Sequence, residues 1–203
     1  KKYLIKNRIS GFLIPMNGCL PTIRLNLNKR CMEKAKLNLD ALSKDKNISN
    51  VIIATTWYRD KYYSSDGFII DPNQSRFASE LIHLKNELEK NNKRVFLIGP
   101  LLIPGENLAS RLGRQLKFSA ISEQEALKSL KKESSLFNNI FEGTLKNLFI
   151  ELENNLLLPH NYFCDLNHCY FGDRSNMYFS DSNHLSLQGR KKVMNLFDDI
   201  PLK

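Results

Sequence analysis

No stretch of this 203-residue sequence approaches the roughly twenty apolar residues that a membrane-spanning helix needs. The most apolar run, Val95 to Pro104, is short and is interrupted by Gly99 and Pro100. A secretory leader, with its basic, apolar and small-residue regions, is also missing. The sequence begins with Lys1 and not with Met, so we expect a processed product or a piece of a longer protein. The lack of a targeting segment therefore says little about location.

Motifs of nucleic-acid recognition are missing as well. The sequence has no ribonucleoprotein, helix-turn-helix or zinc-finger pattern, and basic and aromatic residues do not alternate regularly. The formal net charge is nevertheless +9. Scattered charge of this kind mainly keeps helix faces solvated, and attraction to an anionic surface, such as phosphorylated glycan or lipid head groups, is the functional alternative. We expect no nucleic-acid partner.

Cysteine is scarce, and the four cysteines form two local pairs, Cys19/Cys31 and Cys164/Cys169. An even number and close pairing suggest disulfides and hence an oxidising compartment. A zinc site built from Cys164, His168, Cys169 and another histidine is a competing interpretation, although the Cys-x4-Cys spacing has no matching second pair. Reduced structural cysteines are a third possibility.

Strand-like and helix-like segments alternate along the chain. Helical periodicity predicts helices at residues 29–46, 73–92, 107–116, 122–154 (broken near 143) and 185–198. Strands are predicted at residues 9–15, 51–57, 94–99 and 161–165, with loops at 16–28 and 58–72. The run at 51–57 is β-branched without polar alternation, which is typical of a parallel strand buried on both faces.

This alternation predicts an α/β fold, with a parallel sheet that carries helices on both faces. The length and ordinary globular composition favour a single domain over residues 1–203. In such sheets the ligand site lies at the carboxyl ends of the strands. Trp57, Pro100 and Asp181 each follow a strand-like run, so we expect them to gather at one edge of the sheet.

The most informative motif lies near the C-terminus, where Asp181 precedes His184 by three residues between the last predicted strand and the last helix. An imidazole can take a proton from a nucleophile, while a carboxylate fixes its tautomer and stabilises the imidazolium. The pair is therefore a candidate for the base and its orienting group in a serine hydrolase or acyltransferase. An Asp-x-x-His by itself is common, and a purely structural histidine is the alternative. The Leu-Ser-x-x-Gly that follows strengthens the catalytic interpretation.

With these residues the sequence resembles the SGNH hydrolase superfamily. More narrowly, it resembles the SGNH domain fused to multi-span membrane acyltransferases that O-acetylate bacterial surface glycans. The last block of that group reads approximately Tyr-x-Asp-x-x-His-Leu-Ser-x-x-Gly, and the matching residues are Tyr178, Asp181, His184, Leu185, Ser186 and Gly189. Three further segments are similar to that group: Gly18-Cys19-Leu20-Pro21 with Cys31, the strand ending in Trp57, and Cys164-Asp165 with Cys169.

The resemblance implies a three-layer, flavodoxin-like SGNH domain on the periplasmic side of the inner membrane, tethered through a domain outside this chain. His184 would be the general base, and Asp181 would orient it. Trp57, Gly18 and Tyr58 would lie in the substrate or oxyanion region, where aromatic rings could stack on sugars or simply pack the loop. The partners would be a polysaccharide acceptor and a fused or associated membrane acyltransferase domain. No metal or cofactor is implied.

Two blocks of the superfamily are absent. The first is Gly-Asp-Ser, which holds the nucleophile at the end of the first strand, and Gly172-Asp173-Arg174-Ser175 lies too late in the chain to replace it. That first strand lies between the second and third, so we expect a strand-plus-serine segment before Lys1, with residues 1–8 as the end of the first helix. In a rival register, Gly11 to Met16 is the first strand and Cys19 is the nucleophile.

The second absent block is Gly-x-Asn-Asp, whose asparagine donates to the oxyanion. Thr55-Thr56-Trp57-Tyr58 stands in its place. Three functions remain open at this point: an acyltransferase acting on a surface polysaccharide, a carbohydrate acetylesterase in which water takes the acyl group, and a glycan-binding module that has lost its nucleophile.

Overall fold

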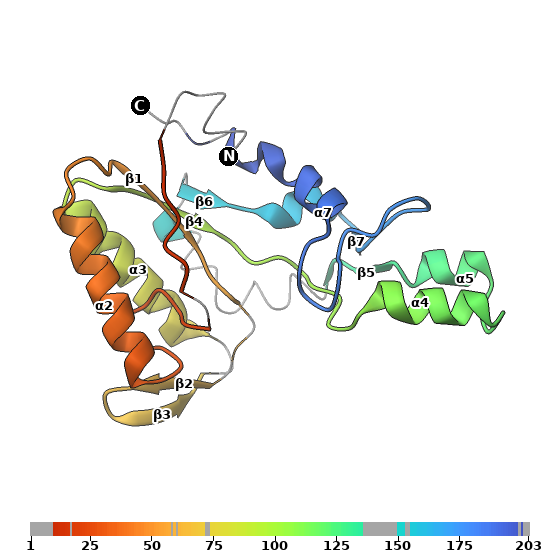
Figure 1. Ribbon diagram of the computed structural model, residues 1–203, viewed down its shortest axis with the longest axis horizontal. Coiled ribbons are helices and arrows are strands. Elements are labelled where there is room, and N and C mark those ends of the chain that lie inside the picture. The colour runs from red at the N-terminus through yellow and green to blue at the C-terminus, as the bar shows by residue number, and fades with distance from the viewer. Residues whose placement is uncertain are drawn as a thin grey trace. The chain divides into compact units, whose positions relative to one another are not determined.

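The computed structural model describes residues 10–16, 18–57, 59, 61–71, 74–135, 150–152, 155–198 and 200 (Figure 1). The chain divides into two compact units. The first comprises residues 1–98, 140–157 and 202–203, and the second comprises residues 99–139 and 158–201. The helix expected at residues 1–8 lies outside the described residues. A single domain over residues 1–203 remains a prediction.

The first unit is built on a three-stranded parallel sheet in the order β1-β4-β6. The strands are β1 (Asn50–Ala54), β4 (Arg94–Ile98) and β6 (Leu156–Leu157). Val95, Phe96 and Leu97 in the central strand are all buried, because β4 has a strand neighbour on each side and its side chains are covered on both faces. The apolar run beginning at residue 94 is therefore the middle of the sheet.

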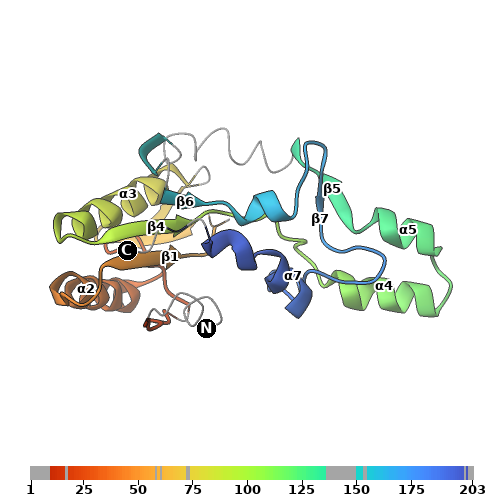
Figure 2. The ribbon, with the colours of Figure 1, turned by 90° about the horizontal axis from the view of Figure 1, so that it is seen from above.

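Two long helices belong to this unit, α2 (Lys29–Lys44) and α3 (Ser75–Lys90). The α3 helix packs on β4 and on α2, and both helices run alongside the sheet (Figures 1 and 2). The Asn28 side chain caps α2 by accepting a hydrogen bond from the amide of Cys31. One face of α3 is buried through Phe77, Ala78, Leu81, Leu84 and Leu88. The predicted α/β fold, a parallel sheet flanked by helices, is confirmed.

The edge strand β1 differs from the prediction. It ends at Ala54, and Ile52 is 41% exposed while Val51 and Ile53 are buried. The prediction of a parallel strand is confirmed, but its burial on both faces was wrong, since a strand with one strand neighbour is covered less than a central one even when its residues are equally apolar. In the part of the chain that the structure describes, β1 pairs only with β4. Residues 10–16 form no strand, against the prediction for 9–15.

A β-hairpin replaces the loop predicted at residues 58–72. Its antiparallel strands are β2 (Lys61–Ser64) and β3 (Gly67–Ile70). Gly67 has a φ of +110°, a conformation that favours glycine and closes the turn after Asp66. Tyr62 on the inner face is buried and stacks on Phe77, with ring centroids 5.5 Å apart. An Asp-Gly pair between aromatic runs is a hairpin signature that could have predicted this element.

The second unit contains short elements. They are α4 (Leu108–Lys117), α5 (Glu123–Lys128), β5 (Lys131–Glu133), the 3-10 helix η2 (Pro159–Tyr162), β7 (His168–Tyr170), α7 (Leu187–Lys192) and the 3-10 helix η3 (Met194–Phe197). β5 pairs antiparallel with β7. The core of this second unit includes the buried rings of Phe163, Phe171, Tyr178 and Phe179. Neighbouring rings are in contact, and their centroids lie 5.7–5.9 Å apart.

Three predictions for this unit were wrong. The helix that begins after Ser122 has a capping box formed with Glu125 but ends at Lys128, because residues 131–133 pair their backbone with β7. Residues 136–149 of the predicted helix lie outside the described residues. Residues 161–165 are not a strand, and Pro159 begins a 3-10 turn there. The closing helix, predicted over residues 185–198, is broken after Lys192, and Leu187 in its first turn is 60% exposed. Helical spacing cannot distinguish a continuous helix from short pieces whose backbone finds tertiary partners.

None of the helices in the described residues has both the length and the hydropathy of a membrane span. Both predicted disulfides are confirmed: Cys19–Cys31 in the first unit and Cys164–Cys169 in the second.

Candidate active site

The structure brings Asp181 and His184 together in a single turn. One carboxylate oxygen of Asp181, Oδ1, accepts the backbone amides of Asn183 and His184 at 2.9 and 2.8 Å. The other, Oδ2, lies 2.8 Å from Nδ1 of the His184 ring. The amides of Asn183 and His184, followed by the His184 ring, lower the pKa of Asp181 to about 2. Asp181 is therefore a carboxylate, and it fixes the Nδ1–H tautomer of His184.

The ring of His184 is accessible for chemistry. Its side chain is 73% exposed, so a nucleophile or substrate can reach it. With Nδ1 directed at Asp181, Nε2 is the nitrogen that can accept and return a proton. The turn is closed by the Ser180 amide, which donates to the His184 carbonyl at 2.8 Å.

The remaining residues of the motif hold this turn on the start of α7. Ser186 caps the helix: its hydroxyl accepts from the Gly189 amide at 3.1 Å and donates to the Met177 carbonyl at 2.6 Å. A Cβ on Gly189 would lie only 2.0 Å from the carbonyl oxygen of Tyr178. The segment before the turn therefore contacts the first turn of α7 closely, and the motif has a glycine where the two backbones meet.

Tyr178 connects this segment to the preceding loop. Its ring is buried, and its hydroxyl donates to Oδ2 of Asp173 at 2.8 Å. Burial, together with the Asp173 carboxylate, raises the pKa of Tyr178 to about 12. Tyr178 thus supports the turn through packing and stays protonated.

The other predicted site residues, Gly18, Trp57 and Tyr58, belong to the first unit, whereas Asp181 and His184 belong to the second. Gly18 has a φ of +68° and precedes a loop held by Asn26, a fully buried residue whose amide donates to the carbonyls of Leu20 and Thr22. Trp57 is 6% exposed, and its indole donates to the Ile98 carbonyl at 3.2 Å. Tyr58 lies outside the described residues. Their role at a substrate site stays a prediction.

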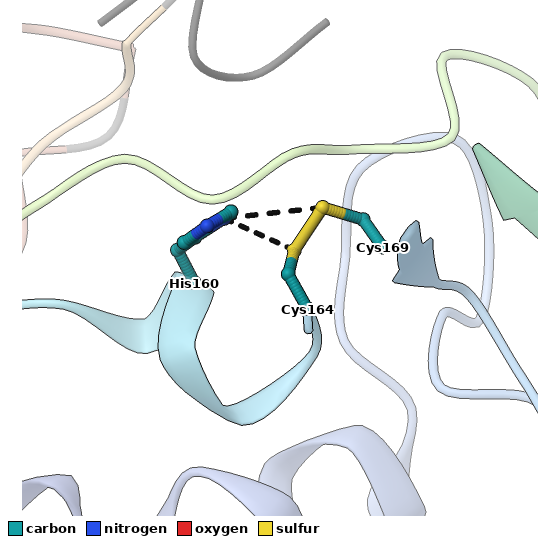
Figure 3. A group of neighbouring side chains, drawn as sticks. All are labelled: His160, Cys164 and Cys169. Carbon is teal, nitrogen blue, oxygen red and sulfur yellow. Dashed lines mark hydrogen bonds between the residues drawn. A yellow bond between two sulfur atoms is a disulfide. The ribbon is translucent and has the colours of Figure 1, made fainter. Parts of the chain in front are cut away.

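The disulfides decide the interpretations that needed free thiols. The sulfurs of Cys164 and Cys169 are bonded to each other, so neither is a thiolate that could bind zinc. The neighbouring histidine is His160 and not His168: its Nδ1 lies 3.0 Å from the Cys164 sulfur and 4.0 Å from that of Cys169 (Figure 3). Burial lowers the pKa of His160 to about 4. Cys19 is likewise bonded to Cys31, so the rival assignment of Cys19 as nucleophile is wrong.

The parallel sheet and the Asp-x-x-His turn before the last helix mark an α/β domain of the SGNH hydrolase type. Residues 2–199 match the sequence model of the SGNH domain that is fused to AT3 domains, and the chain belongs to this family.

A solved structure agrees with this fold. The periplasmic domain of a lipopolysaccharide acetyltransferase from Salmonella ser. Paratyphi A superimposes with a TM-score of 0.65, covering 98% of this chain and 75% of that one. The two sequences are 12% identical, so the likeness concerns the fold. No curated protein matches the chain.

Proposed function

We propose that this chain is an extracytoplasmic domain that transfers an acetyl or related acyl group to a hydroxyl of a cell-surface polysaccharide. The observation that carries the proposal is the Asp181–His184 contact of 2.8 Å at an exposed ring. Membership of a family fused to AT3 domains supports a membrane acyltransferase as the source of the acyl group. The similar Salmonella structure belongs to a lipopolysaccharide acetyltransferase, which supports a polysaccharide acceptor. Two disulfides support an oxidising compartment.

The proposed mechanism has two acyl-transfer steps. In the first, Nε2 of His184 takes the proton of a serine hydroxyl, the serine oxygen bonds to the acyl carbon, and the donor's leaving group departs with that proton. In the second, Nε2 takes the proton of a sugar hydroxyl, whose oxygen displaces the serine. The proton then returns to the serine oxygen. Asp181 stabilises the imidazolium in both steps and stays ionised.

The serine nucleophile is proposed to come from outside residues 1–203, because the sequence contains no Gly-Asp-Ser. The coding sequence upstream of Lys1 tests this directly. A Gly-Asp-Ser stretch there supports an enzyme. Its absence favours the remaining alternative, a glycan-binding module without a nucleophile.

The function is tested with the protein that carries the chain together with the rest of its coding sequence. Acetyl transfer from a labelled donor is measured with the polysaccharide present and absent. We expect acceptor-dependent product, and His184→Ala to lower the rate by about a thousandfold or more. His83→Ala is the matched control, because His83 lies on α3 and contacts Arg24. Label released equally fast without acceptor would indicate an esterase, and activity that survives His184→Ala would refute the proposed base.

A further inference from the structure

The loop between β4 and α4 contacts the candidate catalytic turn directly. The amide of Gly105 donates to the carbonyl of Ser182 at 3.1 Å. Ser182 lies between Asp181 and His184 in the turn. Gly105 makes this hydrogen bond with a φ of +78°, a backbone conformation that favours glycine. The position of the Pro104–Gly105 segment is therefore coupled to the position of the turn.

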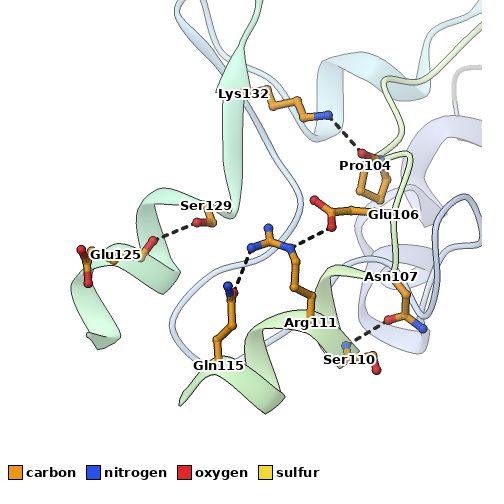
Figure 4. A network of polar contacts seen from close by, with 9 residues as sticks. All are labelled: Pro104, Glu106, Asn107, Ser110, Arg111, Gln115, Glu125, Ser129 and Lys132. Atoms are coloured by element: carbon orange, nitrogen blue, oxygen red, sulfur yellow. Dashed lines mark hydrogen bonds and ion pairs between the residues drawn. The ribbon is translucent and has the colours of Figure 1, made fainter. Parts of the chain in front are cut away.

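Lys132, in β5, also binds this segment. Its Nζ donates to the Pro104 carbonyl at 3.0 Å (Figure 4). The same Nζ lies 5.5 Å from the centroid of the Phe171 ring. Phe171 is 1% exposed and contacts Phe179, two residues before Asp181. An ammonium donor forms a stronger hydrogen bond than a neutral one, and the ring face adds a cation–π attraction. Lys132 thus joins the loop to the aromatic core beneath the turn.

A second group of polar contacts joins the end of the loop to α4. Arg111 pairs with Glu106 at 2.8 Å and bonds Gln115 at 3.0 Å, and Asn107 caps α4 by accepting from the Ser110 amide (Figure 4). The Arg111–Glu106 pair is solvent-exposed, and exposed ion pairs contribute little. Lys132 therefore adds a charge-assisted hydrogen bond to a loop that also packs through its buried residues Leu102 and Pro104.

We propose that Lys132 is a positioning residue for the Asp181–His184 turn, acting through the Pro104 carbonyl and the Gly105–Ser182 hydrogen bond. Its effect on the turn depends only on the geometry, while its effect on catalysis rests on the proposed function. The alternative is that Lys132 only keeps the strand solvated and does not position the turn. Lys131 offers the matched comparison, since it is equally an exposed residue of the same strand and no hydrogen bond or ion pair joins its side chain to another described residue.

The direct test is hydrogen exchange of the Gly105 amide by NMR. In Lys132→Met, which keeps the apolar stem and loses the ammonium, we expect the Gly105 amide to exchange about tenfold faster or more, since one charge-assisted hydrogen bond is lost. Lys131→Met should leave the rate unchanged, and Lys132→Arg should restore most of the protection. If Lys132→Met does not fold, Lys132→Gln, which keeps a donor on a shorter side chain, replaces it in the same comparison.

Two further readouts separate positioning from general stability. The ¹⁵N shift of His184 Nδ1 reports its bond to Asp181, and we expect it to move in Lys132→Met and not in Lys131→Met. In the transfer assay, kcat should fall with little change in KM. Unchanged exchange at Gly105, or equal effects in Lys131→Met, would overturn the proposal. A wild-type protein without transfer activity would refute the proposed function and leave the exchange result standing.

Discussion

Among single residues, Asp181 is the carboxylate most tightly tied to the chemistry of the turn. Its two oxygens accept two backbone amides and face one imidazole nitrogen. The sequence motif predicted the pairing with His184, since the two residues lie three positions apart. The amide bonds to Asp181 could not be read from the motif, because they depend on the conformation of the turn.

The lowered pKa of Asp181, about 2 against an ordinary value of 3.8, makes a prediction about acid stability. Because the pKa is lower in the folded state, the ionised carboxylate stabilises the fold above about pH 4, and this contribution is lost as the pH falls to about 2. We expect Asp181→Asn to flatten the pH dependence of urea unfolding in that window. Asp66→Asn, which alters an exposed carboxylate in the hairpin turn, is the control for general charge effects. An equal flattening by both variants would contradict the assignment.

Gly189 yields a prediction in which steric contact opposes helix propensity. Alanine is preferred over glycine within a helix by about 1 kcal/mol. Because a Cβ here would lie 2.0 Å from the Tyr178 carbonyl, Gly189→Ala should nevertheless destabilise the protein in denaturant unfolding. Gly113→Ala in α4 is the matched control, since its Cβ would meet nothing within 4 Å, and it should stabilise by about 0.5–1 kcal/mol. A gain in stability for both variants would show that the close contact is relieved at no cost.

At the scale of elements, local patterns predicted those segments whose burial follows their own sequence. The α2 and α3 helices and the β4 strand lie where apolar spacing placed them. The hairpin and the short strand β5 were missed. A β-strand is defined by a partner that can lie far away in sequence, and β5 pairs with residues 168–170. Such pairing is absent from any local window.

Lys93 shows how one side chain joins the end of α2 to the start of β4. It is 6% exposed, and its Nζ donates to the carbonyls of Asp45 and Ile48 at 2.6 and 2.9 Å. Lys93→Met leaves both carbonyls without this donor, so we expect a loss of about 1–3 kcal/mol in the free energy of unfolding. Lys90→Met, which breaks only the exposed pair with Glu87, should cost less than about 1 kcal/mol. Equal losses would mean that burial of the ammonium offsets its two bonds.

At the scale of the whole molecule, each of the two units is built from separate stretches of the same chain. The chain passes between them after residues 98, 139, 157 and 201, and each unit carries its own disulfide. Repeated passage gives neither unit a continuous sequence of its own. This is the physical ground for the predicted single domain.

A single domain should unfold in one step. Trp57, the only tryptophan, reports on the first unit by fluorescence, and exchange of the Phe171 amide, bonded to the Leu130 carbonyl, reports on the second. We expect the same unfolding free energy from both probes, and Val95→Ala in the first unit should lower both values equally. Separate free energies, or a loss seen by Trp57 alone, would show two independent units.

The sequence by itself determined the α/β class and the Asp181–His184 pair, and it indicated both disulfide pairs. Each depends on local spacing or on a motif of contiguous residues. Tertiary structure alone decided the exposed face of β1, the pairing of β5 with β7, the aromatic core beneath the turn, and the contact of Lys132 with Pro104. These features join residues that are distant in the chain, and their energy comes from burial and pairing that no local pattern records.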